Sequence, residues 1–266
     1  MAMLKLRMYQ VDAFASEVFR GNPAAVVPLD KWLPEYQLQG IATENNLAET
    51  AFFVPTTEGK FHLRWFTPTQ EVPLCGHATL ASAYVIFTDL HPSWQSVRFD
   101  TLSGELGVGR RGEVFVLDFP SRLPEACEPP ANLLQGLTEK PVQVLKTGVD
   151  TNYYAVYEHE EMVSRIKPNL MLLVQLHPYC VVVTAPGAQS DFVSRYFAPS
   201  YGIPEDPVTG SIHCALIPYW SKRLNKSRLL AKQISKRGGE LYCELLGERV
   251  AIGGKAVKYF EGDIYL

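Results

Sequence analysis

Apolar and polar residues alternate over many short stretches of the chain, which predicts mostly strands, with one long apolar helix in each half. The strand-like stretches are rich in β-branched and aromatic residues and end at turns or prolines. Residues 77–87 differ, because small and apolar residues follow one another there as in a buried helix. In the first half we expect strands at residues 4–14, 24–28, 49–54, 61–66, 96–100, 104–109 and 114–119, and a further helix at 33–45.

A proline-rich passage separates the halves and is the best candidate for a linker. It contains Pro120, Pro124, Pro129 and Pro130, and the strand pattern starts again after it. The second apolar helix is expected at residues 211–223, where the ring of a proline should bend it. In the second half we expect strands at residues 142–146, 153–157, 180–184, 241–245, 250–252 and 257–260, and a short helix at 169–176.

The segment that begins the first apolar helix occurs twice. Residues 71–81 match residues 205–215 at an offset of 134. Chance similarity between two α+β segments is the alternative, but several motifs in the same order favour duplication. The other matching segments are 64–68 with 195–199, and 104–113 with 239–248.

The repeat and the element pattern together predict an α+β fold. We expect two pseudo-symmetric modules, each a curled, barrel-like sheet around a central helix. The first module is expected at residues 1–121 and the second at 122–266, with the last strand crossing back to the first module.

Composition and charge describe an ordinary globular protein. A net charge of -3 gives no reason to expect nucleic acid or a membrane surface as a partner. Five cysteines are an odd number and form no Cys-x-x-Cys pair, which favours a reducing, cytoplasmic compartment over a disulfide scaffold or a zinc site. The first residues lack the apolar core of a secretion signal, and the apolar run at 78–87 is too short to span a bilayer.

Each repeat places a loop at the start of an apolar helix. The first amides of such a helix have no acceptor within the helix and carry the positive end of its dipole, so they favour an anion. A ligand with a carboxylate is the natural candidate. If the two helix starts face each other, the site is the cleft between the modules.

Glu49 is the carboxylate with the most unusual surroundings. It begins an apolar strand, where alternation puts it on the same face as Ala51 and Phe53. Its counterpart in the repeat is Cys180, so the fold does not require a glutamate there. A carboxylate in apolar surroundings can take and return a proton, whereas a solvated charge at a strand end is the structural alternative.

Three polar residues belong to the repeated loops. His77 lies at the start of the first helix, and Asp206 and Ser211 lie in the matching loop. Each also has a structural interpretation, since a histidine can be a satisfied core residue, an aspartate can brace a turn and a serine can cap a helix.

Cys75 precedes the first apolar helix and has two interpretations. A helix N-terminus lowers the pKa of a thiol, which suits a nucleophile or an acid–base group. Its counterpart is Thr209, so a racemase with two thiols is not supported, and a small buried cysteine is the other reading. No His-x-His, His-Glu-x-x-His, Gly-x-Gly-x-x-Gly, Walker or Gly-x-Ser-x-Gly motif is present, so we predict neither a metal nor a cofactor.

The motifs resemble those of the phenazine-biosynthesis PhzF-like family. The resemblance rests on five stretches that run in the expected order, with Gly238-Gly239-Glu240-Leu241 as an extension. These stretches are Phe19-Arg20-Gly21-Asn22-Pro23-Ala24-Ala25-Val26, Asn46-Leu47-Ala48-Glu49-Thr50-Ala51-Phe52, Arg64-Trp65-Phe66-Thr67-Pro68, Glu71-Val72-Pro73-Leu74-Cys75-Gly76-His77-Ala78-Thr79 and Glu205-Asp206-Pro207-Val208-Thr209-Gly210-Ser211.

The resemblance implies the diaminopimelate-epimerase fold and a cofactor-free, commonly dimeric isomerase. It implies that Glu49 shuttles a proton within a small carboxylate-bearing substrate, as in the member that acts on a dihydro-hydroxyanthranilate ring. The assisting residues would be His77, Asp206 and Ser211, and the substrate would be bound by Asn22, Cys75, Gly76, Thr209 and Gly210.

Two other functions remain open. The match also resembles the MAWD-binding branch, whose members are discussed as binding partners, so the chain could be a non-catalytic module that binds a ligand or a protein. Epimerase relatives use two cysteines, and only Cys75 is present here, opposite Thr209, which weakens an amino-acid epimerase. The sequence does not name a substrate.

Overall fold

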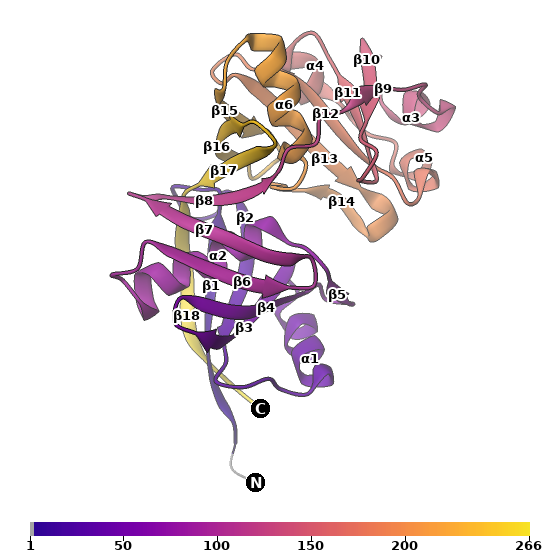
Figure 1. The fold of residues 1–266 in the computed structure, drawn as a ribbon. Coiled ribbons are helices and arrows are strands. Elements are labelled where there is room, and N and C mark those ends of the chain that lie inside the picture. The colour runs from indigo at the N-terminus through magenta and orange to yellow at the C-terminus, as the bar shows by residue number, and fades with distance from the viewer. Residues whose placement is uncertain (1–2) are drawn as a thin grey trace. The chain divides into compact units, whose positions relative to one another are not determined.

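The computed structural model describes residues 3–266, and contacts divide them into two compact units (Figure 1). Unit 1 takes in the chain up to Asp118 together with Gly253–Leu266, and unit 2 takes in Phe119–Ile252. We describe each unit by itself. The proposed folding modules at residues 1–121 and 122–266 stay a prediction.

Unit 1 is built from strands around one helix. The sheet runs from β18 through β1, β2, β3, β4 and β6 to β7 and β8, with β2–β3 and β4–β6 as the parallel pairs. Helix α2 packs on β1, β2 and β3. The elements are β1 (Lys5–Ala13), β2 (Asn22–Pro28), α1 (Glu35–Asn45), β3 (Glu49–Thr57), β4 (Lys60–Phe66), β5 (Glu71–Val72), α2 (Gly76–Val85), the π-helix η1 (Ile86–Leu90), β6 (Ser96–Thr101), β7 (Gly104–Arg111), β8 (Val114–Pro120) and β18 (Ala256–Tyr265).

Unit 2 repeats this strand arrangement, but different helices connect its first two parallel strands. Its strands pair in the order β9, β10, β11, β12, β13, β15 and β16, with β11–β12 and β13–β15 parallel. Helix α6 packs on β15 and β16. The elements are β9 (Glu125–Ala126), α3 (Ala131–Gly136), β10 (Gln143–Lys146), β11 (Asn152–Val156), α4 (Glu160–Arg165), α5 (Leu170–Leu173), η2 (Val174–Leu176), β12 (Cys180–Pro186), β13 (Phe192–Ala198), η3 (Pro199–Tyr201), β14 (Ile203–Asp206), α6 (His213–Leu224), β15 (Arg228–Gln233), β16 (Gly239–Leu246) and β17 (Arg249–Gly254).

The two units share strand register as well as strand order. Ala51 pairs with Trp65 in β3–β4, and Val182 pairs with Tyr196 in β12–β13. Both residues of the second pair lie 131 positions after those of the first. The duplication read from the sequence is therefore present in the backbone hydrogen bonding.

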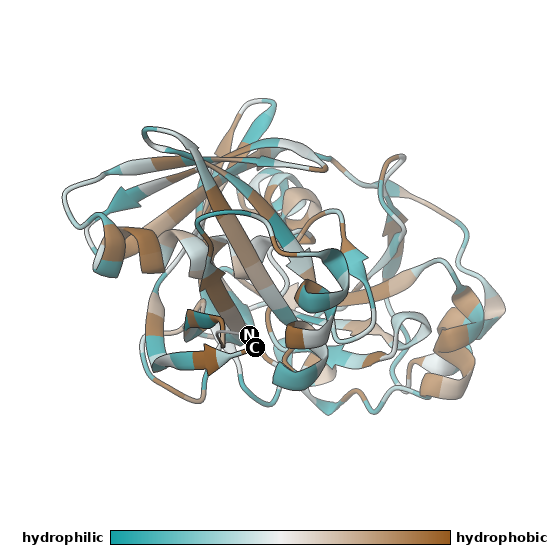
Figure 2. Cartoon of the chain, turned by 90° about the horizontal axis from the view of Figure 1, so that it is seen from below, coloured by the Kyte–Doolittle hydropathy of each residue, from teal (hydrophilic) through white to brown (hydrophobic). Residues whose placement is uncertain are grey.

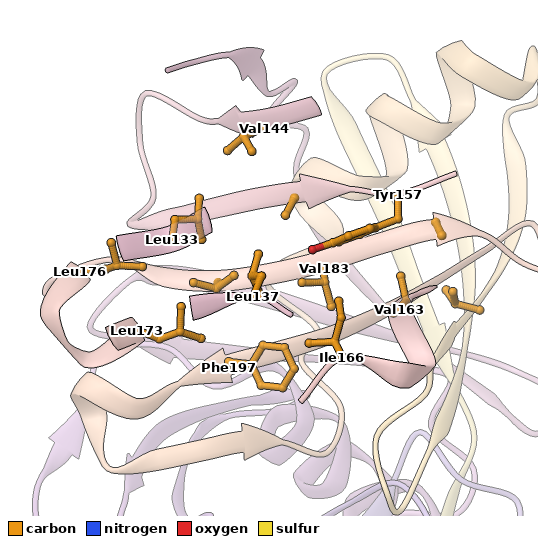
Figure 3. Packing of buried hydrophobic residues seen from close by; sticks show 14 residues of the cluster. Leu133, Leu137, Val144, Tyr157, Val163, Ile166, Leu173, Leu176, Val183 and Phe197 are labelled. Carbon is orange, nitrogen blue, oxygen red and sulfur yellow. The ribbon is translucent and has the colours of Figure 1, made fainter. Parts of the chain in front are cut away.

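Apolar side chains from strands and helices form a separate core in each unit. Figure 2 shows apolar residues, in brown, along the strands and helices and hydrophilic residues, in teal, at many turns. In unit 2, helix residues Leu133 and Leu173 meet strand residues Val183 and Phe197 (Figure 3). Tyr157 joins this core because its hydroxyl donates to the carbonyl of Glu139 at 2.9 Å.

The structure corrects the predicted elements at two places. Helix α6 begins at His213 instead of residue 211, because the amide of His213 bonds to the Gly210 carbonyl at 3.0 Å in a tighter turn. The helix continues through Pro218, and the bend expected there stays a prediction. Strands β13 and β15 were not predicted; Arg228 and Lys232 give β15 a polar sequence, although its alternate residues are buried.

No helix within residues 3–266 is long and apolar enough to cross a membrane.

Gly254 lies where unit 1 has no room for a side chain. A Cβ at this position would lie 2.3 Å from Cδ1 of Phe14 and 3.2 Å from Cδ1 of Leu80. We expect Gly254→Ala to lower the free energy of unfolding by about 1–3 kcal/mol, the usual cost of overpacking, in a urea titration. Gly107→Ala is the control, because its Cβ meets nothing within 4 Å in strand β7. Equal effects of the two changes would contradict this account.

Candidate active site

The loop before α2 is fixed by two contacts of unit 1. Arg64 binds Glu71 with one edge of its guanidinium, through Nε at 2.7 Å and Nη2 at 2.6 Å. The Ser103 hydroxyl donates to the carbonyl of Pro73 at 2.8 Å. The start of α2 is thus held in place by side chains outside the helix.

Helix α2 begins after Cys75, whose backbone is extended. The amide and hydroxyl of Thr79 both donate to the Cys75 carbonyl, at 3.1 and 2.6 Å. The amides of Gly76 and His77 meet no acceptor within residues 3–266. These two amides, with the helix dipole behind them, can bind an anionic group.

Four predicted site residues of unit 1 form one buried cluster. His77 Nε2 lies 3.0 Å from Glu49 Oε2, and their side chains are only 6% and 13% exposed. Asn22 Nδ2 lies 3.2 Å from His77 Nδ1, and Cys75 Sγ lies 3.5 Å from the same nitrogen. Parallel pairing of Ala24 with Glu49 brings β2 and β3, and hence Asn22 and Glu49, to the start of α2.

The charges in this cluster set its protonation. Burial lowers the pKa of His77, but the Cys75 sulfur and the Glu49 carboxylate raise it by more, so that the pKa lies well above the ordinary value. Burial, with the nearby Glu49 charge, raises the pKa of the Cys75 thiol to about 11. The Glu49 carboxyl group thus lies beside an imidazole and a thiol whose pKa values are both raised.

The matching loop of unit 2 is held in the same way. Arg195 binds Glu205 through Nε at 2.8 Å and Nη2 at 3.0 Å. The Ser235 hydroxyl donates to the carbonyl of Pro207 at 2.8 Å, as Ser103 does in unit 1. The framework of the loop is thus duplicated along with the motif.

Asp206 and Thr209 form the polar centre of this second loop. The Thr209 hydroxyl donates to Asp206 Oδ2 in a short hydrogen bond. Gln233, which is fully buried, accepts from the Thr209 amide at 2.8 Å and donates to the Asp206 carbonyl at 2.8 Å. Gln233 therefore fixes the shape of the loop, and sequence reasoning missed it because it lies on the unpredicted strand β15.

Gly210 and Ser211 lie in the turn before α6. Their amides meet no acceptor within the described residues, so the turn offers donors like those at the start of α2. The half-buried Ser211 hydroxyl makes no hydrogen bond to another described residue. Asp206, Thr209, Gly210 and Ser211 thus occupy one short loop, and their predicted roles remain predictions.

His213 makes the stability of unit 2 depend on pH. It is fully buried, and burial lowers its pKa to about 4. Between pH 4 and the ordinary histidine value the unfolded chain binds a proton that the folded chain does not, so stability falls as the pH is lowered. We expect the free energy of unfolding to fall by about 3 kcal/mol over this range, measured by urea unfolding at several pH values. His213→Gln should remove this fall, and the exposed control His159→Gln should retain it. Parallel pH curves for wild type and His213→Gln would contradict this expectation.

Comparison with known proteins agrees with the motifs and the fold. The family model described as phenazine biosynthesis-like protein matches residues 11–262. An uncharacterized isomerase of Pseudomonas aeruginosa is 49% identical over 99% of this chain and 100% of its own length. The crystal structure of a PhzF-family protein from Enterococcus faecalis is 46% identical, with a TM-score of 0.94, and covers 99% of this chain and 100% of its own. The chain belongs to the phenazine biosynthesis-like (PhzF) family, and the predicted family is confirmed.

A more distant structure bears on the fold alone. A hydroxyproline epimerase from Agrobacterium vitis has 11% identity and a TM-score of 0.64, over 98% of this chain and 93% of its own. This likeness, with the closer family structures, confirms the predicted α+β fold of the diaminopimelate-epimerase type.

Proposed function

We propose that the chain is an isomerase that needs no cofactor and moves a proton within a small substrate that carries a carboxylate. Relatives that match over their whole length are named isomerases, which supports the reaction class.

The buried pair of Glu49 and His77 carries the proposal. A carboxylate 3.0 Å from an imidazole, at a helix start with unpaired amides, has what a proton shuttle needs. Glu49 takes the proton from one atom of the substrate and returns it to another. His77, held by Asn22, stabilises the charge that the carboxylate regains.

The substrate carboxylate is assigned to the helix starts. Because the two loops repeat in the sequence, the amides near Gly76 and those near Gly210 would both donate hydrogen bonds to the substrate carboxylate. Asp206 and Ser211 are assigned the supporting polar contacts, with Thr209 holding the Asp206 carboxylate in place.

An epimerase with paired thiols is the less supported function. Cys75 is a neutral thiol at neutral pH because its pKa is raised to about 11. Its counterpart Thr209 is engaged with Asp206 and Gln233. Cys75 is therefore assigned to packing against His77 and the substrate, and Cys75→Ser is expected to retain more turnover than Glu49→Gln.

The location and the assembly are also proposals. All five cysteines are free, which supports a reducing, cytoplasmic compartment. The family resemblance supports a homodimer, which sedimentation equilibrium of the full chain tests directly.

Proton exchange in heavy water tests the reaction. The full chain is incubated with small cyclic and amino carboxylates, including dihydro-hydroxyanthranilate, and deuterium incorporation is followed by NMR. Incorporation that depends on the protein supports the isomerase and identifies the substrate class. Binding of carboxylates without any incorporation by a folded chain would favour the non-catalytic binding module.

A further inference from the structure

The side-chain amide of Gln233 makes three hydrogen bonds to the loop that carries Asp206. Its Oε1 accepts from the Thr209 amide at 2.8 Å, and its Nε2 donates to the Asp206 carbonyl at 2.8 Å. A backbone N–H can only donate and a carbonyl can only accept, so these two partners settle which end of the amide is oxygen and which is nitrogen. Nε2 also donates to the Thr209 hydroxyl oxygen, at 3.3 Å.

The hydrogen bonds from Gln233 to Asp206 run in one direction. The nitrogen of a side-chain amide donates and does not accept. The Thr209 hydroxyl therefore accepts from Gln233 and gives its own hydrogen to Asp206 Oδ2, in the short hydrogen bond described above. An oxygen that accepts this bond carries no proton, and such a donor favours the ionised form of a carboxyl group.

The matching position of unit 1 does not carry a glutamine. Gln233 is the last residue of β15 and pairs with Gly239, and Thr101 is the last residue of β6 and pairs with Gly104. The Thr101 hydroxyl donates within its own hairpin, to the Gly104 carbonyl at 2.7 Å. The bidentate ion pairs and the serine contacts of the loops are present in both units, whereas this amide accompanies Asp206 and Thr209 in unit 2. Gln233 therefore belongs to the chemistry of the second loop and is not part of the duplicated framework.

We propose that Gln233 is a positioning residue, which turns the Thr209 hydroxyl towards Asp206 and so fixes the Asp206 carboxylate as a hydrogen-bond acceptor for the substrate. The contact of Asp206 with the substrate rests on the proposed function, whereas the chain of hydrogen bonds does not. Gln233 is fully buried and acts through its neighbours. We expect Gln233→Leu to lower the rate of substrate proton exchange by about 10²-fold, the usual effect of a misplaced group in an active site.

Gln233→Glu separates positioning from the filling of space, because the introduced carboxyl group has the shape of the amide at every pH. When protonated, it can accept from the Thr209 amide and donate to the Asp206 carbonyl, as glutamine does. When ionised, it has no hydrogen to donate and puts a negative charge beside both acceptors. Burial raises the pKa of a carboxyl group, so the exchange rate should lie within about 10-fold of the wild type at about pH 5.5 and fall about 10-fold further by about pH 8.5.

The ratio of the Gln233→Glu rate to the wild-type rate at each pH isolates the introduced group, because the charged and titratable groups around it are present in both proteins. These groups are Asp206, Tyr196, His213 and the ion pairs of Arg195 with Glu205 and Lys232 with Glu240. Gln175→Glu is the matched control. Gln175 is exposed in η2 of the same unit, and its amide also donates to a backbone carbonyl, that of Met171 at 3.1 Å. Its rate ratio should stay constant with pH.

A second measurement needs no substrate. Carbon NMR of the full chain follows the titration of the Asp206 carboxyl group, which should occur at lower pH in the wild type than in Thr209→Val, because the hydroxyl favours the ionised form. Gln233→Leu should move the titration in the same direction. Adding Gln233→Leu to Thr209→Val should move it little further, since Gln233 acts on the carboxylate through that hydroxyl.

The positioning role and the proposed function fail in distinguishable ways. A rate ratio for Gln233→Glu that is constant with pH, or wild-type exchange by a folded Gln233→Leu variant, would overturn the positioning role while the isomerase stands. If the wild type exchanges no proton with any compound, the isomerase is refuted, and the titration of Asp206 alone decides the hydrogen-bond chain. Identical titrations in the wild type and Thr209→Val would refute that chain.

Discussion

Glu49→Gln should lower the rate of substrate proton exchange by about 10²–10⁴-fold, the usual contribution of a positioned acid–base group. The amide has the size of the carboxylate and keeps an oxygen beside His77 Nε2, which lies 3.0 Å from Glu49 Oε2. It cannot take a proton from carbon at neutral pH. The loss should therefore appear in kcat, whereas substrate binding at the helix start should change little. NMR in heavy water measures the exchange rate.

Glu58→Gln is the matched control. Glu58 is exposed in the turn directly after β3, the strand that Glu49 begins, so the same change of charge is made on the same hairpin. Its exchange rate should equal that of the wild type. Substantial turnover by a folded Glu49→Gln variant would remove Glu49 from the mechanism, and a parallel loss in Cys75→Ser would favour the epimerase.

Arg195→Met should lower the free energy of unfolding by about 3–5 kcal/mol, because it leaves a half-buried carboxylate without its partner. Arg195 is 12% exposed and binds Glu205 with one edge of its guanidinium, through Nε and Nη2. Its Nη1 also donates to the carbonyls of Val163 and Ile166, at 3.0 and 2.8 Å. The substitution therefore removes these donors from the Glu205 carboxylate and the Ile166 carbonyl, and the Val163 carbonyl keeps only the amide of Ile166 at 3.4 Å. Urea unfolding followed by circular dichroism measures the loss.

An exposed pair provides the comparison. Arg228 binds Glu244 at 2.8 Å, but the arginine side chain is 81% exposed, so Arg228→Met should cost less than about 1 kcal/mol. Adding Glu205→Gln to Arg195→Met should recover part of the lost stability, since the unpaired charge is then gone. A cost below that of Arg228→Met would show that the buried pair contributes nothing.

Much of the framework could be predicted from the sequence, because it is duplicated. The match of Arg64 and Glu71 with Arg195 and Glu205 marked residues that form the same bidentate ion pair in each unit. The strand β15 could not be predicted in this way, because Arg228 and Lys232 hide its buried alternate positions. A loop with a repeated motif can be found from the sequence, whereas a strand of mixed composition is recognised only from the strands it pairs with.

The candidate site was predictable in part. Glu49 and His77 were singled out for different reasons, and the packing of α2 on β2 and β3 brings them together. Gln233 was missed, since an isolated glutamine carries no signal, and its importance comes only from its contacts with Thr209 and Asp206.

Because the two units share strand register, each position in one unit has a structural counterpart in the other. Cys180 stands in β12 where Glu49 stands in β3, each at the first residue of its strand and paired with the strand before it. Asp206 faces Tyr196 where Val72 faces Trp65. The ion pairs and serine contacts of the framework were kept in both copies, and the reactive groups were divided between them. A change made at one position can thus be compared with the same change at its mate, in one backbone and under one set of conditions.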